Sequence, residues 1–227
     1  MSRLQVFIGY DEREAIAFDV LKYSILRRSS IDLNVRPLIT SEIPGYTRPR
    51  HPNQSTEFAF TRFMVPYLSG YEGVSIFMDC DMLMQADIKD LLLDVPERCA
   101  VAVCQHDYTP STSVKMDGQP QTAYPRKNWS SLMVFQNDLC RSLTPYYVNR
   151  ASAADLHRLA WMPDSMIGHL PLDWNWLCGE YRPKPNAKCF HWTLGGPWML
   201  NYEDADHAEL WREEYAHMKA SRQKVAV

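Results

Sequence analysis

The chain has 227 residues, of which 46% are hydrophobic and 22% are charged, a balance typical of folded globular proteins and not of disordered ones. The formal net charge of −3 and the pI near 6.2 exclude a broad basic surface of the kind that binds nucleic acid. The length suits one domain, which we expect to span residues 1–227.

Cysteine spacing and hydropathy indicate the compartment. The six cysteines form no C-x-x-C pair and no zinc-type spacing, which favours reduced, buried thiols. No apolar run approaches the roughly 20 residues that a membrane span needs. The residues after Met1 begin a strand pattern and not a secretory signal. We therefore expect a cytoplasmic protein without a transmembrane segment.

The first forty residues carry the pattern of strand, helix and strand. Leu4–Gly9 is an apolar run that ends on glycine, residues 10–30 have helical spacing, and residues 33–39 are again strand-like. This order predicts a βαβ unit, which implies a parallel sheet with a right-handed crossover.

The rest of the chain alternates less regularly. Further strands are expected at 74–78, 99–105 and 130–135, and helices at 58–68, 87–93, around Leu139, around Asp155 and at 203–219. The polar stretch 107–128 is expected to form a long functional loop or hairpin, and 161–198 to lack regular periodicity. The prediction is an α/β fold with a doubly wound, mostly parallel sheet flanked by helices and a mixed, loop-rich second half.

Two aspartates follow an apolar strand, at Asp79-Cys80-Asp81. Alternation in an extended segment points both carboxylates the same way, and such a pair suits Mg²⁺ or Mn²⁺. Asp204-Ala205-Asp206 has the same spacing but lies in a polar segment, where we expect a solvated helix start. Because ligands bind beyond the carboxyl ends of parallel strands, Gly9-Tyr10-Asp11 and the Asp79 pair are expected to face one crevice.

His191 lies in a strand-like aromatic patch, Cys189-Phe190-His191-Trp192, shortly before Gly195. A histidine among aromatic residues is either a packed core residue or a metal ligand. The glycines after it would let the backbone approach a phosphate closely. Spacing alone leaves both interpretations of His191 open.

Four segments resemble nucleotide-sugar glycosyltransferases of the GT-A fold, in particular the glycogenin and lipopolysaccharide galactosyltransferase family and small bacterial and algal-virus sugar transferases. The segments are Thr61-Arg62-Phe63 with residues 76–81, residues 128–133, Asp164 with Leu170-Pro171 and Trp174-Asn175, and His191 with Gly195 and Pro197-Trp198. The resemblance runs from Phe7 to Trp198. It implies a GT-A-like fold and transfer of a sugar from a nucleotide-diphosphate donor to a glycan or other hydroxyl acceptor.

The resemblance also implies roles for single residues. Asp79, Asp81 and His191 would be the ligands of Mn²⁺ or Mg²⁺. The donor is expected to be a UDP-sugar, and the residues expected to contact it are Tyr10, Asp11, Arg62, Asp79, Asn128, Trp129, Ser130 and Gly195. Gly196 stands where the family has a lysine, which leaves the cation at the diphosphate open among Arg126, Lys127 and Lys188.

The resemblance favours retention of the anomeric configuration. Retention by double displacement needs a carboxylate nucleophile, and the catalytic candidates are Asp107 and Asp164. Inversion needs a general base, for which Asp164, Asp173 or His106 could serve. A front-face reaction, in which the departing phosphate deprotonates the acceptor, needs neither group and is our preferred hypothesis.

Two other classes of protein stay open. A sugar-phosphate nucleotidyltransferase also sets paired aspartates beside a nucleotide, but it usually has a glycine-rich, basic phosphate loop, which Gly9-Tyr10-Asp11-Glu12-Arg13 lacks. A non-catalytic nucleotide-sugar-binding protein would bind donor and metal without releasing a nucleoside diphosphate.

Overall fold

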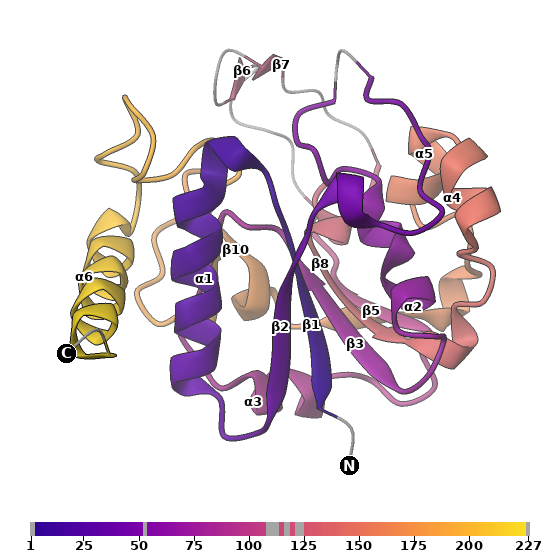
Figure 1. Ribbon diagram of the computed structural model, residues 1–227, viewed down its shortest axis with the longest axis horizontal. Coiled ribbons are helices and arrows are strands. Elements are labelled where there is room, and N and C mark those ends of the chain that lie inside the picture. The colour runs from indigo at the N-terminus through magenta and orange to yellow at the C-terminus, as the bar shows by residue number, and fades with distance from the viewer. Residues whose placement is uncertain (1–2, 52–53, 108–113, 116–118, 121–124, 226–227) are drawn as a thin grey trace.

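The computed structural model describes residues 3–51, 54–107, 114–115, 119–120 and 125–225. A central sheet in the order β2-β1-β3-β8-β5-β9 separates α1 and α6 from α2, α4 and α5 (Figure 1). Its strands are β1 (Leu4–Gly9), β2 (Leu33–Leu38), β3 (Val74–Met78), β5 (Val101–Cys104), β8 (Leu132–Gln136) and β9 (Ile167–Leu170).

Strand directions follow from the pairings. β1 is parallel to both β2 and β3, and β5 is parallel to β9. β8 is antiparallel to β3 and to β5, so β5 runs in the same direction as β3. Five strands therefore point one way and β8 points the other, which confirms the expected α/β fold with a mostly parallel sheet. Two of these strands, β8 and β9, come from the second half of the chain.

Helix α1 (Ala15–Arg28) connects β1 to β2 and confirms the βαβ unit. Asp11 caps the 3-10 turn Glu12–Glu14 that precedes it, since the Asp11 side chain accepts a hydrogen bond from the Arg13 backbone. The helix buries Phe18, Leu21 and Ile25 in the main core. Burial of this apolar face, and not local propensity alone, stabilises the helix.

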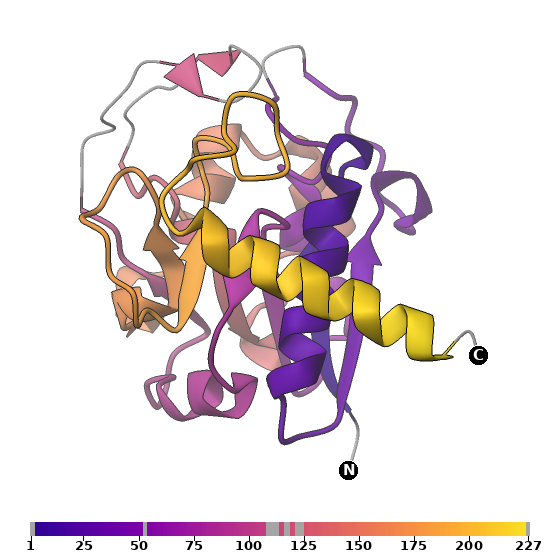
Figure 2. The same cartoon turned by 90° about the vertical axis from the view of Figure 1, so that its left-hand side faces the viewer.

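A second, three-stranded sheet joins parts of the chain that are distant in sequence. It consists of β10 (Trp176–Leu177), β11 (Cys189–His191) and β4 (Met82–Met84), with β11 antiparallel to β4. Helix α6 (Ala208–Val225) lies across the outside of α1 (Figure 2). The buried carboxylate of Glu214 on α6 forms ion pairs with Arg27 and Arg28 of α1.

The remaining elements are short. They are α2 (Val65–Leu68), α3 (Ile88–Leu93), α4 (Pro145–Arg150), α5 (Ala153–His157) and the two-residue strands β6 (Val114–Lys115) and β7 (Gln119–Pro120). β6 and β7 pair in an antiparallel fashion within the stretch expected to be a loop or hairpin. No helix within the described residues combines the length and the hydropathy that a membrane crossing requires.

Two expected helices have other bounds in the structure. The helix at 58–68 is a 3-10 turn (Thr61–Met64) followed by four α-helical residues, because Pro66 fits only the first turn of a helix. The terminal helix begins at Ala208 and not at residue 203. The irregular segment 161–198 contains β9, β10 and β11, whose two to four residues are too short to show periodicity.

Asp204-Ala205-Asp206 is not a helix start. The carboxylate of Asp206 accepts a hydrogen bond from the Gly179 backbone at 3.2 Å, and its carbonyl accepts one from the Trp192 indole at 2.8 Å. These bonds hold the segment in a turn that joins the loop after β10 to the end of β11. Asp206 of the second D-x-D sequence therefore stabilises this turn.

Candidate metal and donor site

The Asp79–Asp81 segment lies at the carboxyl edge of the main sheet, directly after β3. The Asp79 backbone N–H donates to the Ser131 carbonyl at 2.9 Å, and the Asp81 carbonyl accepts from the Trp192 backbone at 3.0 Å. One bond ties the segment to the residue before β8, and the other ties it to the residue after β11. These two backbone hydrogen bonds fix the position of the segment that carries both carboxylates.

Asp79, Asp81 and His191 come together at this edge. Each offers one ligand atom, and these atoms lie within 4.8 Å of one another. Nε2 of His191 is 3.1 Å from Oδ1 of Asp81. That Oδ1 atom is buried and accepts no hydrogen bond within the described part of the chain. A buried acceptor without a donor, beside a second carboxylate and an imidazole, fits a divalent cation such as Mn²⁺ or Mg²⁺.

Arg62 supplies a buried positive charge beside the carboxylates. Its side chain is 7% exposed, and Nη1 lies 2.9 Å from Oδ1 of Asp79. The same nitrogen donates to the Ser130 carbonyl at 2.8 Å, and the guanidinium packs against the Phe77 ring at 4.8 Å. Its Nε atom has no hydrogen-bond partner among the described residues. Arg62 can therefore donate a further hydrogen bond at this site.

Glu14 is a third acidic group near the two aspartates. Burial, together with the negative charges of Asp81, Asp11 and Asp79, raises the pKa of Glu14 well above its usual range. The side chain is 1% exposed, and its Oε2 atom has no hydrogen-bond partner in the described residues. A raised pKa favours the protonated form of Glu14, which adds less negative charge to this edge than an ionised carboxylate would.

A cavity of about 130 Å³ opens beside the three candidate ligands. Its lining includes six of the residues expected at the site, namely Arg62, Asp79, Asp81, Asn128, Ser130 and His191. The sequence therefore predicted six of the thirteen residues that line this cavity. Ser131, His157 and Thr193 also line the cavity and were not predicted.

Tyr10 and Asp11 line a neighbouring hollow of about 470 Å³ at the ends of β1 and β2. The segment 55–59 belongs to both hollows, because Glu57 lines this one and Phe58 lines the one beside Asp79. The single expected crevice is thus two adjoining hollows. The two hollows lie side by side along the carboxyl edge. They would suit a ligand with a base in the hollow beside Tyr10 and a diphosphate in the hollow beside Asp79.

Asp11 is engaged within its own turn. Its carboxylate receives the Arg13 side chain at 2.7 Å and the Glu57 backbone N–H at 3.2 Å. Burial raises the pKa of Asp11, but the hydrogen bonds and charge of Arg13 outweigh that effect, so the pKa is lowered. Asp11 is therefore ionised, and it holds the turn that carries Tyr10.

Two predicted donor contacts lie outside the lining of both hollows. The Trp129 indole donates to the His106 carbonyl at 2.9 Å. Gly195 has a φ of +131°, and a Cβ atom there would approach the Tyr202 ring to 2.8 Å, so this position requires glycine. A donor contact of Trp129 or Gly195 stays a prediction.

The catalytic candidates Asp107 and Asp164 also lie outside these linings. Asp107 is exposed, and the residues that follow it up to position 113 are not described. The Asp164 side chain is 78% exposed and forms an ion pair with Arg126 at 2.7 Å. Their catalytic roles stay predictions. Of the cations considered for the diphosphate, Arg126 is engaged with Asp164 and Lys188 with Asp94 at 2.8 Å.

His157 carried no sequence signal, because it ends a helix of five residues. Its Nδ1 atom lies 2.9 Å from the Ser130 hydroxyl. Burial, with smaller effects from the charges of Arg62 and Arg48, lowers the pKa of His157 to about 3. The imidazole is therefore neutral at physiological pH, so it can orient Ser130 but cannot act as a cationic group.

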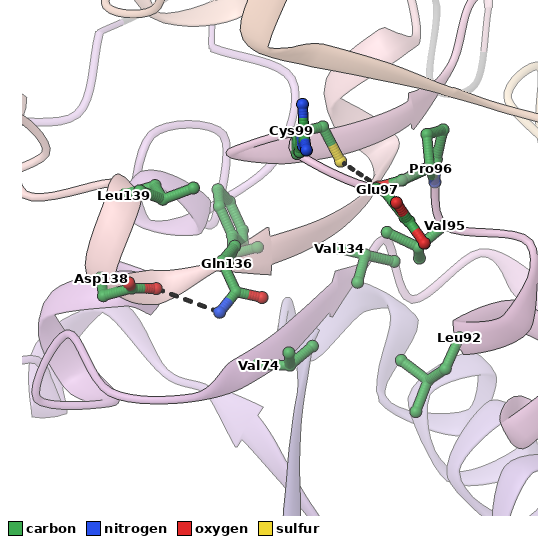
Figure 3. A pocket seen from close by; sticks show the side chains of 12 residues that line it. Val74, Leu92, Val95, Pro96, Glu97, Cys99, Val134, Gln136, Asp138 and Leu139 are labelled. Atoms are coloured by element: carbon green, nitrogen blue, oxygen red, sulfur yellow. Dashed lines mark hydrogen bonds between the residues drawn. The ribbon is translucent and has the colours of Figure 1, made fainter.

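A larger hollow of about 490 Å³ lies at the opposite, amino edge of the sheet (Figure 3). Val74 at the start of β3 and Gln136 at the end of the reversed strand β8 both line it. Two of its polar side chains are hydrogen-bonded, since Gln136 donates to Asp138 at 3.1 Å and the Cys99 thiol donates to the Pro96 carbonyl at 3.2 Å. Its size therefore does not make it the better candidate for a binding site.

Comparisons with known proteins found a sequence relative and solved structures with a similar fold. The sequence matches no protein-family model. It is 41% identical over 232 residues to Protein CDI of Arabidopsis thaliana, covering 98% of this chain and 90% of that protein.

Solved structures give the fold. The bifunctional glycosyltransferase WbbM superposes with a TM-score of 0.65 and 19% identity over 95% of this chain, which spans only about half (50%) of the WbbM chain. The galactosyltransferase LgtC, solved with donor and acceptor sugar analogues, superposes with a TM-score of 0.61 and 10% identity, covering 94% of this chain and 96% of LgtC. The expected GT-A fold is confirmed by these likenesses.

Proposed function

The chain belongs to the family of Arabidopsis thaliana Protein CDI, and from its fold and site we propose that it is a metal-dependent glycosyltransferase. It transfers a sugar from a nucleoside-diphosphate donor to a hydroxyl group of an acceptor such as a glycan. The observation that carries this proposal is the convergence of Asp79, Asp81 and His191, with ligand atoms within 4.8 Å of one another. In a GT-A fold this convergence lies at the sheet edge where ligands bind.

We assign the cation, Mn²⁺ or Mg²⁺, to Asp79, Asp81 and His191. When bound, it would neutralise the charge that develops on the departing nucleoside diphosphate. Arg62 would add a fixed positive charge, because it is already buried beside Asp79. We assign the donor sugar to the 130 Å³ cavity lined by Asn128 and Ser130, and the base, expected to be uracil, to the hollow beside Tyr10.

The surroundings of the cavity favour retention by a front-face reaction. Asp79 and Asp81 are the carboxylates in the described lining, and the metal site uses both. Double displacement would need a further carboxylate there. In the front-face reaction, the bond from the anomeric carbon to the phosphate oxygen breaks as the acceptor oxygen bonds to the same face. The acceptor proton moves to the departing phosphate oxygen.

The candidate general bases for inversion either form ion pairs or have a low pKa. Asp173 forms an ion pair with Lys184, and Asp164 forms one with Arg126. Burial, with smaller effects from His191 and His169, lowers the pKa of His106 to about 3. A base whose pKa lies so far below neutrality removes an acceptor proton poorly. These environments support retention over inversion.

The proposal is tested by release of the nucleoside diphosphate. The protein would be incubated with Mn²⁺ and a panel of UDP- and GDP-sugars, each with glycan acceptors, and then with EDTA in place of the metal. Metal-dependent release of UDP or GDP together with a glycosylated acceptor is the expected result. Pyrophosphate formation from a nucleoside triphosphate and a sugar phosphate would instead identify a nucleotidyltransferase. Donor binding without release would identify a nucleotide-sugar-binding protein.

A further inference from the structure

A chain of side-chain hydrogen bonds runs from the cavity wall to the candidate ligand His191. The Ser131 hydroxyl lies 2.7 Å from the Asn128 carbonyl oxygen. Nδ2 of Asn175 lies 2.8 Å from the Ser131 hydroxyl, and Oδ1 of Asn175 lies 2.7 Å from Nδ1 of His191. All three bonds are short, and they join residues 3, 44 and 16 positions apart.

The chemistry of the groups fixes the direction of every bond in this chain. A carbonyl oxygen can only accept, so the Ser131 hydroxyl donates its one hydrogen bond to the Asn128 carbonyl. The Ser131 oxygen must therefore accept from the Asn175 amide, which turns Oδ1 of Asn175 toward His191. Because Oδ1 also only accepts, Nδ1 of His191 carries a proton. In the neutral ring Nε2 then presents a lone pair toward Asp81, 3.1 Å away.

Burial makes this arrangement difficult to replace. Asn175 is 0% exposed, His191 is 1% exposed and Ser131 is 2% exposed. Water is therefore not available to take over a lost hydrogen bond, and each unpaired group would remain desolvated. The backbone also fixes the position of Asn175. This residue immediately precedes β10, in which Leu177 pairs with His191 of β11.

We propose that Asn175 is a positioning residue that holds His191 in the tautomer and orientation that bind the divalent cation. The proposal depends on the metal site of the proposed function but not on sugar transfer. Without Asn175, the ring can place its proton on Nε2, where it would point at Asp81 and occupy the position of the cation. Asn175 touches neither cavity in the described lining, so its effect passes through His191.

The direct test is the Mn²⁺ affinity of Asn175→Ala, measured by calorimetric titration of the full chain. The expected result is an affinity 10 to 100 times weaker than wild type, the usual effect of removing a hydrogen-bond partner behind a metal-ligating histidine. Asn175→Asp keeps an acceptor for Nδ1 of His191, so it is expected to recover most of the lost affinity. UDP binding in EDTA should be the same in all three proteins.

Asn137→Ala is a matched control, at a buried asparagine that directly follows β8 of the main sheet. Asn137 is also 0% exposed, accepts a hydrogen bond from the Ser75 hydroxyl at 2.7 Å and donates to the Glu72 carbonyl at 2.9 Å. It lies at the amino edge, away from the candidate ligands. Its loss is expected to lower the melting temperature about as much as Asn175→Ala does, with the Mn²⁺ affinity unchanged.

The outcomes separate the alternatives. Wild-type Mn²⁺ affinity in a folded Asn175→Ala protein would overturn the proposal, and so would equal losses in the alanine and aspartate variants. Should Asn175→Ala not fold, nitrogen-15 spectra of His191 in Mg²⁺-loaded wild type decide: a proton on Nδ1 supports the positioning role, and a proton on Nε2 excludes it. A wild-type protein that binds Mn²⁺ with this pattern but transfers no sugar would refute the proposed function alone.

Discussion

The two edges of the main sheet carry hollows of opposite character. At the carboxyl edge the cavity is small, about 130 Å³, and is lined by the charged groups of Arg62, Asp79 and Asp81. At the amino edge the hollow is nearly four times larger, about 490 Å³, and is walled by apolar side chains such as Val74 and Phe135. In volume alone the amino edge would be the stronger candidate.

The two edges differ in how their buried polar atoms are satisfied. Asp81 Oδ1 and Arg62 Nε lack hydrogen-bond partners within the described residues at the carboxyl edge. At the amino edge, Gln136 and Asp138 pair with each other, and Asn137 makes two hydrogen bonds. Because an unpaired buried polar group costs free energy, its persistence indicates a ligand that completes the site. Unsatisfied charged groups, and not size, make the carboxyl-edge cavity the better candidate site.

Asp81→Asn is expected to have the largest effect, because it removes the charge of a proposed metal ligand at the carboxyl edge. Sugar transfer should fall by roughly 10³-fold, and Mn²⁺-dependent nucleotide binding should be lost. The metal-free variant should be at least as stable as wild type, since one of two like charges is gone. Initial rates and melting curves measure these effects. Asp138→Asn at the amino edge is the control, and an equal loss there would contradict the contrast between the edges.

Arg62→Met is expected to destabilise the fold. It leaves the carboxylate of Asp79, which is 15% exposed, without its buried cation. We expect the free energy of unfolding to fall by about 3 kcal/mol, measured by urea denaturation without metal. Arg36→Met is the control, because Arg36 is exposed and lies over the Phe7 ring at 4.4 Å. Equal costs for both variants would show that Arg62 does not compensate the carboxylates.

His157 makes stability at the carboxyl edge depend on pH. Its folded pKa of about 3 lies below its unfolded value of 6.5, so the unfolded chain binds more protons between these values. Stability is therefore full above pH 6.5 and decreases as the pH falls toward 3. At pH 5 the expected loss from this residue is about 2 kcal/mol.

His157→Gln should remove that loss. The variant's unfolding free energy is expected to change less between pH 8 and pH 5 than that of wild type, as measured by urea titrations at each pH. His106 has a similarly lowered pKa, so part of the wild-type slope should remain in the variant. An unchanged slope would mean that His157 is protonated in the folded protein.

Gln136→Ala is expected to have the smallest effect. The side chain donates to Asp138 at the rim of the amino-edge hollow. We expect the unfolding free energy to change by less than about 0.5 kcal/mol. UDP affinity measured with Mn²⁺ should be unchanged. A lowered UDP affinity would show that the amino edge contributes to donor binding after all.

The sequence predicted the parts of the site that follow long apolar strands. β1 and β3 are mostly buried runs of six and five residues, and aspartates follow both strands closely, so Asp11, Asp79 and Asp81 were visible from local pattern. His191 was open on spacing, and the family resemblance identified it as a ligand. The structure confirms that it lies with Asp79 and Asp81.

Other features had no signal in the periodicity, and Asn175 was named only as part of a segment that carries the family resemblance. Asn175 and His157 lie at the ends of segments of four and five residues, too short for periodicity to show. Their importance depends on partners 16 to 44 positions away, which only tertiary structure brings together. The same reason explains why β10 was missed, since its two residues are a strand only because β11 pairs with them.

The measurement that tests the central claim most directly is calorimetric titration of UDP and GDP into the protein, first with Mn²⁺ and then with EDTA. The carboxyl-edge site predicts that one nucleotide binds with Mn²⁺, that EDTA greatly weakens the binding, and that the double variant Asp79→Ala/Asp81→Ala loses it while remaining folded. Nucleotide binding that is equally strong in EDTA and in this variant would contradict the assignment of Asp79, Asp81 and His191 to a cation-dependent donor site.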